Sequence, residues 1–460
     1  MIDKLKGLLI LVLSFTSVVL LFLNFGMTRE DLTMYTSFGE RNIIFDSNAL
    51  LSDAVMAESI GVNFGDETHT LLNNPVNEDI WNNSAELIKE IFEEENKSIT
   101  SIDFINNSIY NEVLKQESIV LFLKKNISAT TLLNGLGVEN TKDIVEEFGE
   151  IKTIYISLER NFVIINEGIR NHLLTFNSLD VSNIKEQVNI LKEKGFNPYK
   201  TLDEVFKNKN IGYVPVLSEQ NIEGVRFHNI LETLTDSNIE NIVYNFFQKE
   251  VNYLREIKEE GIQTIYVDRE KILKISEEGL ISYFNPEEPQ VTERNLYISL
   301  DTALSFISNN LGYDSSLYLK EIRPIELQDY SGFKFIFGKS AKSYKVNIQN
   351  EDILDYIEID VYNNHVRRFS QLFRGEIPES TPLVELKPNQ EVLSIISKNL
   401  ININQGLFPN GERSLSFNEI LNRVEDASLV YVDKGDENPL DIAWKVEIMD
   451  EEFEFILERK

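Results

Sequence analysis

Residues 264–286 read TIYVDREKILKISEEGLISYFNP and contain three short runs of β-branched and aromatic residues, TIYVD, ILKIS and LISYF. With VNYLREI at 251–257 they predict four consecutive strands, because the segments EEG, DREK and EEG between them are typical of turns. Apolar and charged residues alternate along the runs, as in an antiparallel sheet with one face on a core and the other in water. The stretch therefore predicts an antiparallel β-meander.

A predicted helix precedes this meander, and the same order recurs further along the chain. DSNIENIVYNFFQKEV (236–251) has apolar residues at helical spacing. A helix pattern at 296–312 comes before strand patterns, and helix patterns at 389–400 and 416–424 come before strand patterns that reach residue 458. The sequence leaves open whether these units are duplicated or share the ordinary packing of an α+β protein.

The N-terminal half predicts a more varied set of elements. Residues 28–75 are polar and predict irregular structure, whereas EDIWNNSAELIKEIFEEE (78–95) predicts an amphipathic helix. A strand is predicted at 118–123, before a helix, and a strand pair is predicted around a turn near residues 159–161.

A further helix and strand are predicted after residue 179. Asp180 and Ser182 are candidate N-caps, and Gly195 with Pro198 ends the helix pattern. IGYVPVL (211–217) then predicts a strand.

The N-terminal sequence MIDKLKGLLILVLSFTSVVLLFLNFGM predicts a membrane anchor. The 21 residues from Gly7 to Met27 carry no charge, and at ~1.5 Å per residue they match the ~30 Å hydrocarbon layer. Lys4 and Lys6 precede this run, so the positive-inside rule places the N-terminus in the cytoplasm and residues 28–460 outside. A cleaved signal peptide is the alternative, but the long apolar run without an A-x-A site favours an uncleaved single-pass helix.

Hydroxyl residues interrupt the apolar run on one face of the predicted helix. Ser14, Ser17 and Val18 lie on that face and form a candidate transmembrane helix contact, because small and hydroxyl side chains let a partner helix approach closely. The alternative is that these residues have no partner, since isolated serines are tolerated in membrane helices.

A chain of 460 residues is too long for one ordinary core, so several domains are expected. We predict an α+β protein whose extracytoplasmic part consists of helices packed on antiparallel meanders. The predicted parts are a cytoplasmic tail and transmembrane helix (1–27), an N-terminal α+β domain (28–178), a central helix-plus-meander domain (179–290) and a C-terminal α+β domain (291–460).

Composition excludes several kinds of chemistry. The chain has no cysteine, which excludes disulfides, thiol nucleophiles and cysteine-ligated metal sites. It has 75 acidic and 44 Lys and Arg residues, for a formal charge of −31. Because such a charge repels phosphate backbones, we expect no nucleic-acid partner, and we interpret the acidity as a source of solubility.

Familiar catalytic motifs are not found in the sequence. His69, His172, His228 and His365 are not spaced as metal ligands, and we interpret each as a surface or locally hydrogen-bonded residue. GFKFIFGKS (332–340) differs from a phosphate-binding loop, because five residues rather than four separate its glycines and they predict a strand. We therefore predict no catalytic, cofactor-binding or metal-binding residues and no cofactor.

The segment IVYNFFQKEVNYLREIKEEGIQTIYVDREKILKISEEGLISYFNP (242–286) resembles the central signature of the YycH (WalH) family. The resemblance is carried by the helix ending in paired Phe, by Arg-Glu-Ile, by I-Y-V-D and by G-L-I-S-Y-F-N-P. The segments ESIVLFLKKNISATTLL and LVYVDKGDENPLDIAWKVEI, the latter with Trp444, are also similar, as is the single N-terminal membrane helix. Residues 28–50 depart from the family pattern, which has more aromatic residues there.

The resemblance implies a single-pass cell-membrane protein of low-GC Gram-positive bacteria whose bulk is extracytoplasmic. It implies partners as well, namely a sensor histidine kinase (WalK/YycG-like) that governs cell-wall metabolism and a YycI-like companion protein. We therefore expect a non-enzymatic regulator of this two-component system, held in membrane lipid by residues 7–27. Two alternatives remain open: an anchored envelope hydrolase with a carboxylate pair, and a ligand-binding ectodomain.

Overall fold

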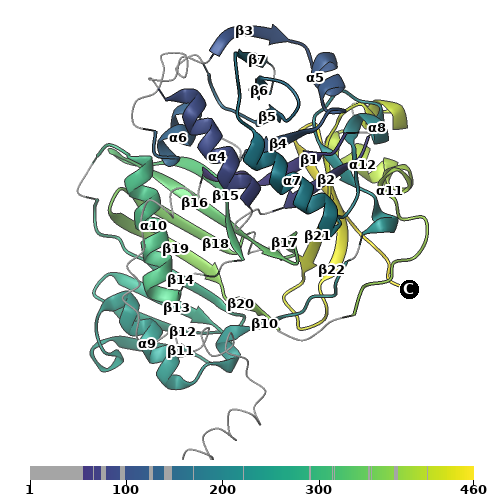
Figure 1. Cartoon of the computed structure of the whole chain (residues 1–460). Coiled ribbons are helices and arrows are strands. Elements are labelled where there is room, and N and C mark those ends of the chain that lie inside the picture. Colours follow the sequence, from purple (N-terminus) through teal and green to yellow (C-terminus); the bar gives the residue numbers. More distant parts are fainter. Residues whose placement is uncertain are drawn as a thin grey trace, which may run out of the picture.

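The computed structural model shows a mixed α+β protein built on large antiparallel sheets, as the sequence predicts (Figure 1). It describes residues 55–65, 67–73, 79–93, 99–123, 128–138, 148–168, 170–220, 222–289, 292–312, 314, 316–350, 353, 355–377, 382–411 and 413–460. The predicted transmembrane helix at 7–27, with Ser14, Ser17 and Val18, lies outside these residues. Within the described ranges, no helix is both long enough and apolar enough to cross a membrane.

The N-terminal part forms a nine-stranded sheet in the order β3-β7-β6-β5-β4-β1-β2-β8-β9, and all neighbouring strands are antiparallel. Its strands are β1 (Ser59–Asn63), β2 (His69–Asn73), β3 (Ile99–Ile105), β4 (Ser118–Phe122), β5 (Thr153–Ser157), β6 (Phe162–Asn166), β7 (Asn171–Phe176), β8 (Tyr199–Thr201) and β9 (Tyr213–Pro215). The strand at 118–123 and the strand pair around 159–161 are confirmed.

The β1–β2 hairpin lies in a stretch for which the sequence predicts irregular structure, so that prediction is wrong for residues 59–73. The physical reason is that several buried side chains of the hairpin are polar. Asn63, His69 and Thr70 are all at most 2% exposed, and each forms a side-chain hydrogen bond. Buried polar residues with hydrogen-bond partners are compatible with a strand, although they hide its apolar alternation.

Helices cover both faces of the nine-stranded sheet. α4 (Asp79–Phe92), α6 (Ala129–Gly135) and α7 (Ser182–Lys194) cover one face, while α5 (Asn107–Val113) contributes Tyr110 to a cluster with Tyr155 and Tyr213 on the other. α4 and α7 lie side by side (Figure 1). The predicted helix at 78–95 is confirmed, and its apolar stripe is buried.

The start of α7 differs from the prediction. Its N-cap is Val181, which forms no side-chain capping bond, whereas Asp180 Oδ1 accepts a hydrogen bond from the Ser182 backbone N–H at 3.1 Å. The prediction that Asp180 or Ser182 is the N-cap is therefore wrong. Gly195 is the C-cap as predicted, with a φ of 89° that suits glycine.

The rest of the chain builds a twelve-stranded sheet in the order β11-β12-β13-β14-β19-β18-β16-β17-β21-β22-β23, with β15 paired to β16. These strands are β11 (Arg255–Glu259), β12 (Gln263–Asp268), β13 (Lys271–Ser276), β14 (Leu280–Phe284), β15 (Leu317–Leu327), β16 (Tyr330–Ala341), β17 (Tyr344–Ile348), β18 (Ile357–Tyr362), β19 (His365–Leu372), β21 (Val424–Asp433), β22 (Asp441–Ile448) and β23 (Glu451–Ile456). A separate pair joins β10 (Phe227–Asn229) to β20 (Arg374–Glu376).

The meander predicted from residues 251–286 is confirmed as β11 to β14, each paired with the next. The first residues of VNYLREI form the 3₁₀ helix η4 (Val251–Tyr253) rather than strand. Two more 3₁₀ turns, η2 (Leu217–Glu219) and η3 (Ile230–Thr233), lie earlier in the chain.

The predicted helices at 236–251 and 296–312 are confirmed as α9 (Asp236–Phe247) and α10 (Leu296–Leu311), and both cover one face of the twelve-stranded sheet (Figure 1). Aromatic rings fill the space between helices and strands. Phe246 and Phe306 pack against Tyr283 at centroid distances of 5.3 and 5.6 Å, and Phe306 packs against Phe369 at 5.4 Å. This face of the sheet is therefore a fixed core.

The last predicted unit joins the same sheet rather than forming its own. α11 (Val392–Lys398), α12 (Leu400–Leu407) and α13 (Phe417–Leu421) precede β21, which pairs in parallel with β17 over four residues. The second and third helix-then-meander units thus share one sheet.

A short segment packs against both sheets. β8 and β9 belong to the nine-stranded sheet, whereas Leu202 and Phe206 of α8 (Leu202–Phe206) lie in the core of the twelve-stranded sheet. Asn208 Nδ2 donates to the carbonyl oxygens of Leu421 and Val424, each at 3.0 Å. The nine-stranded sheet thus continues past residue 178 to residue 215, and the domain boundaries at 178 and 290 stay predictions.

A buried ion pair lies where β17 and β21 meet. Arg374 Nε is 2.8 Å from Asp433 Oδ2, and the two side chains are 2% and 0% exposed. Asp433 also accepts hydrogen bonds from the Tyr356 hydroxyl at 3.0 Å and the Gly435 backbone N–H at 2.9 Å. Arg374 Nη1 donates to the Gly435 carbonyl at 2.9 Å, and Lys339 Nζ donates to the Arg374 carbonyl at 2.6 Å.

Replacing Arg374 by methionine is expected to lower the free energy of unfolding by about 3–5 kcal/mol, because the Asp433 carboxylate would stay buried without its cation. The measurement is urea denaturation followed by circular dichroism. Arg255→Met, at an exposed position of β11, is the matched control and should stay within about 0.5 kcal/mol of the wild type. Equal midpoints for Arg374→Met and the wild type would contradict the assigned role.

Candidate functional site

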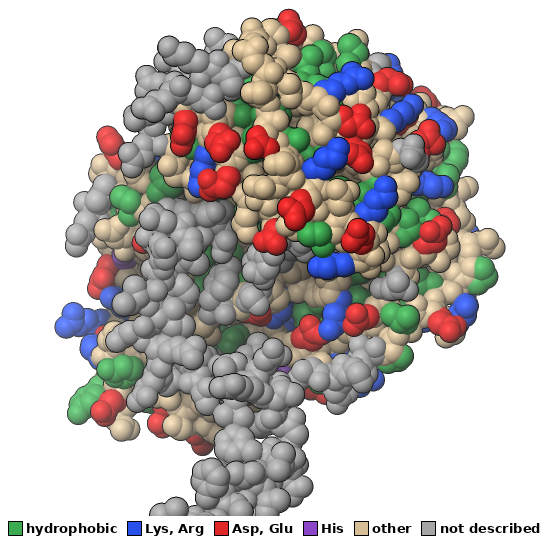
Figure 2. Space-filling model, in the orientation of Figure 1, with side chains coloured by type: hydrophobic (Ala, Val, Ile, Leu, Met, Phe, Trp, Pro, Cys, Tyr) green, Lys and Arg blue, Asp and Glu red, His purple; other side chains and the backbone are tan. Residues whose placement is uncertain are grey.

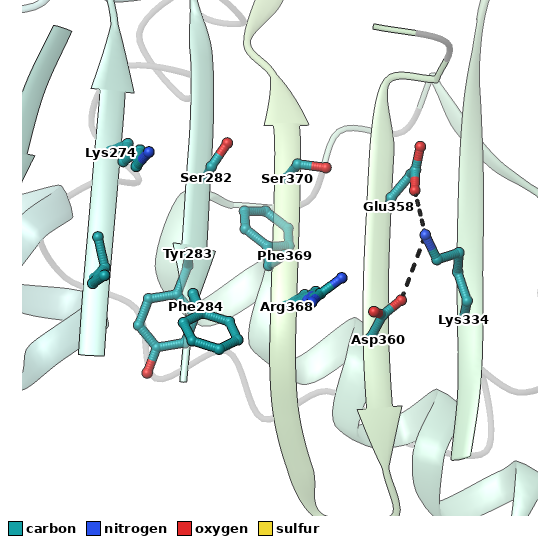
Figure 3. Close-up of a pocket in the computed structure, with 11 residues that line it drawn as sticks. Lys274, Ser282, Tyr283, Phe284, Lys334, Glu358, Asp360, Arg368, Phe369 and Ser370 are labelled. Carbon is teal, nitrogen blue, oxygen red and sulfur yellow. Dashed lines mark hydrogen bonds and ion pairs between the residues drawn. The ribbon is translucent and has the colours of Figure 1, made fainter. Parts of the chain in front are cut away.

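The face of the twelve-stranded sheet opposite α9 and α10 contains a groove of about 460 Å³. β13, β14, β19, β18 and β16 form its floor. Because side chains alternate between the faces of a strand, the residues next to the buried core positions point into the groove. Figure 3 shows the groove side chains of these strands in two rows.

The first row is mostly polar and hydroxylated. Lys274 is opposite Ser282, Ser282 is opposite Ser370, and Ser370 is opposite Glu358 in the register of neighbouring strands. Directly opposite residues in an antiparallel pair have Cβ atoms ~4.5–5.5 Å apart. The row therefore brings an ammonium group, two hydroxyl groups and a carboxylate into one line (Figure 3).

The second row has an aromatic ring and three charges. Phe284 is opposite Arg368, Arg368 is opposite Asp360, and Asp360 is opposite Lys334. The Arg368 guanidinium carbon lies 5.8 Å from the centroid of the Phe284 ring, within the range of a cation–π contact.

The two carboxylates of the groove share one cation. Lys334 Nζ lies 2.6 Å from Glu358 Oε2 and 3.7 Å from Asp360 Oδ1 (Figure 3). Burial raises the pKa of Asp360, while the charges of Lys334 and Arg368 oppose this shift. Burial lowers the pKa of Lys334, but the hydrogen bond to Glu358 and the charges of both carboxylates outweigh it, so its pKa is raised.

The other cations and the hydroxyl groups of the groove make no ion pair or hydrogen bond with other described residues. Within the part of the chain that the structure describes, neither Lys274 nor Arg368 has a carboxylate oxygen within 4.0 Å, and neither the Ser282 nor the Ser370 hydroxyl forms a hydrogen bond. Both cations are exposed. The groove therefore has a paired half around Lys334 and an unpaired half between Lys274 and Arg368.

His69, His172 and His365 are locally hydrogen-bonded, as predicted. His69 Nδ1 is 2.7 Å from Asn63 Oδ1, and His172 Nε2 is 3.0 Å from Glu167 Oε2. His365 is half-buried and forms a hydrogen bond with the backbone of Asn285, while its Nε2 has no partner among the described residues. His228 is also half-buried, and its Nδ1 has no partner there either.

The structure suggests one acidic cluster as a place for a metal ion. The carboxylate oxygens of Glu425, Glu447 and Asp450 lie within 4.8 Å of one another, and this is the only such group of three among the described residues. Glu425 and Glu447 make further interactions within the protein, so the cluster does not by itself indicate an ion. The segment 332–340 lies within strand β16, as the rejection of a phosphate-binding loop requires.

The sequence prediction assigned no functional role to the groove residues. In the sequence, the groove is marked by a polar residue at every second position of these strands. The same pattern is typical of any sheet face that contacts water, so it does not distinguish a site. Comparisons with known proteins add no information, since no family model, curated protein or solved structure matches this chain.

Outside the groove, His69 predicts a pH dependence of stability. Burial lowers its pKa from the usual 6.5, although the charge of Glu204, whose Oε2 is 3.9 Å from His69 Nε2, raises it. Below pH 6.5 the histidine therefore binds a proton more readily in the unfolded chain than in the folded protein. The free energy of unfolding falls as the pH falls below 6.5.

His69→Gln removes this titration while keeping a donor for Asn63. As the pH is lowered from 7.5 to 5.5, we expect the free energy of unfolding of the wild type to fall by more than that of His69→Gln. The measurement is urea denaturation at each pH. Parallel pH profiles of the two proteins would contradict the assignment.

Proposed function

We propose that this protein is a membrane-anchored, non-enzymatic regulator of a sensor histidine kinase (WalK/YycG-like), acting with a YycI-like companion protein. The observation that carries the proposal is the resemblance of residues 242–286 to the YycH family, together with the apolar N-terminal run. The anchor would bring residues 7–27 next to the membrane helices of the kinase, and the acidic ectodomain would lie outside the cell.

The position of the family-like segment supports a role in binding. It contains the second half of α9 and the four strands at one end of the twelve-stranded sheet, where β12 is the one neighbour of β11 among the described strands. Tyr253 and Ile262, which flank β11, are 78% and 60% exposed. An outermost strand with exposed apolar side chains beside it is suited to contact with another protein.

A regulator of this kind can act only through unequal binding. It must bind the active and inactive conformations of the kinase with different affinities, because equal affinity shifts no population. Contacts in the membrane and contacts of the ectodomain are two places where such a difference can arise.

Deleting the gene is expected to change kinase-dependent transcription, measured with a reporter of the kinase's target promoters. Because the chain has no cysteine, Ser14→Cys or Ser17→Cys supplies its only thiol, and we expect disulfide crosslinks to cysteines placed in the kinase's membrane helices. Thr16→Cys is the matched control, since residue 16 faces the opposite side of the helix at ~100° per residue. Unchanged transcription together with no crosslink at 14 or 17 would refute the proposal.

One observation favours a second candidate function, an envelope hydrolase. Glu358 and Asp360 alternate with one residue on β18, and both carboxylates lie within 4.0 Å of Lys334 Nζ, so they are close neighbours, as the carboxyl groups of a glycosidase are at ~5–9.5 Å. Burial raises the pKa of Asp360, as a general acid requires. Lys334 lies between the two carboxylates, however, where a scissile bond would have to enter, so this function ranks second.

An assay of reducing-sugar release from purified cell-wall glycan tests this second function. A regulator should release nothing above background. A hydrolase should show activity that Asp360→Asn lowers at least about 100-fold, the usual contribution of a general acid. Asp355→Asn, outside the groove, is the control and should leave such activity unchanged.

A further inference from the structure

The unpaired half of the groove has the chemistry of an anion-binding site. We propose that it binds a small ligand through an oxyanion group, a phosphate or a carboxylate, between Lys274 and Arg368. The Ser282 and Ser370 hydroxyls would donate hydrogen bonds to the same group. This inference goes beyond the proposed function and holds whether or not the protein contacts a kinase.

The geometry brings the four groups within reach of one point. Ser282 and Ser370 are directly opposite on β14 and β19, so their hydroxyls lie side by side. Lys274 is on the next strand, ~4.8 Å away, and Arg368 is two residues along β19, ~6.6 Å away. Figure 3 shows Arg368 directed toward Asp360, so its side chain must turn toward the serine pair for both cations to meet one oxyanion there.

The partly buried ring of Phe284 lies against the guanidinium group of Arg368. The Phe284 ring lies 5.8 Å from the guanidinium carbon of Arg368 and 5.5 Å from that of Arg367. Arg367 Nη1 also donates to the Pro286 carbonyl at 3.4 Å. A guanidinium held against an aromatic ring loses less freedom on binding than a free one and presents two N–H groups to an oxyanion.

The charges of the groove favour an anion at this end. Glu358 and Asp360 are the carboxylates among the lining residues, and both lie within 4.0 Å of Lys334 Nζ, while Asp360 is also directly opposite Arg368. Lys274, Lys334 and Arg368 outnumber the two carboxylates, so the lining residues have a formal charge of +1 in a chain whose formal charge is −31. On the face that Figure 2 presents, acidic side chains are spread among the basic ones.

The size of the groove and the charge of the chain favour a small ligand over a polyanion. Its volume of about 460 Å³ lies in the ~300–1,000 Å³ range of small-molecule pockets. A nucleic acid or an acidic polymer would also be repelled by the formal charge of −31 that the whole chain carries. Ile272 and Phe284 offer apolar contact to the uncharged part of the ligand.

The test uses the full-length chain in a non-ionic detergent, with inorganic phosphate and acetate as probes and sodium chloride to match ionic strength. The readout is the rate of reductive methylation of Lys274, measured by mass spectrometry, with Lys200 on β8 as the internal control. We expect saturable protection of Lys274 and none of Lys200. Protection by phosphate alone assigns a phosphate ligand, and protection by acetate assigns a carboxylate.

Arg368→Gln is expected to weaken the protecting anion about tenfold, the usual worth of one hydrogen bond to a charged group. Ser282→Ala should weaken it less, and it provides a second variant if Arg368→Gln does not fold. Arg255→Gln, an arginine of the same sheet outside the groove, is the matched control and should bind as the wild type does. The proposal is overturned if neither anion protects Lys274, if Lys200 is protected equally, or if both groove variants bind as the wild type does.

Discussion

The buried ion pair between Arg374 and Asp433 fixes how the two parts of the twelve-stranded sheet meet. Arg374 begins β20, separated by one residue from the end of β19 at Leu372, while Asp433 ends β21 beside Ile348 of β17. The parallel β17–β21 pairing covers only four residues, so it makes a short junction for a sheet of this size. An ion pair that takes its two charges from opposite sides of the junction is satisfied in one alignment only. The ion pair acts mainly by fixing the position of the strands, because burying two charges contributes little net stability.

The groove lies in the part of the sheet on one side of that junction. The groove floor comes from β13 and β14 on one side and from β16, β18 and β19 on the other. β14 and β19 are neighbours although 80 or more residues separate them in sequence, and Phe246 and Phe306 hold them together from the opposite face by packing on Tyr283 and Phe369. A tightly packed core on one face thus keeps the polar rows on the other in register.

The local parts of this architecture are readable from sequence, and the long-range parts are not. TIYVD, ILKIS and LISYF are recognisable strands because alternation and turn residues lie within a few positions of each other. β1 and β2 are not recognisable as strands, because Asn63 and His69 are polar. Hydrogen bonds to other residues allow them to be buried, and the sequence does not show those partners. The capping of α7 also differs from the prediction, since Val181 is the N-cap and Asp180, one residue earlier, accepts from the Ser182 N–H.

The groove shows the same limit at the level of function. Lys274 and Ser282 look like ordinary solvent-facing residues of a meander, and Ser370 and Arg368 look the same on another strand 80 or more residues later. What makes them a candidate site is the β14–β19 pairing, which depends on tertiary packing rather than on either segment.

Half of the groove belongs to the segment that carries the family resemblance. Lys274, Ser282 and Phe284 all lie within residues 242–286, and that segment also provides the outermost strand β11. An anion bound between Lys274 and Arg368 would bridge β13 and β19, which belong to different halves of the floor. It would favour whichever arrangement of the sheet end keeps those strands together, by an amount limited to the difference in its affinity for the two arrangements. Ligand binding in the groove and partner binding at β11 would then be coupled through the hydrogen-bonded strands β12 and β13, and the coupling would be reciprocal.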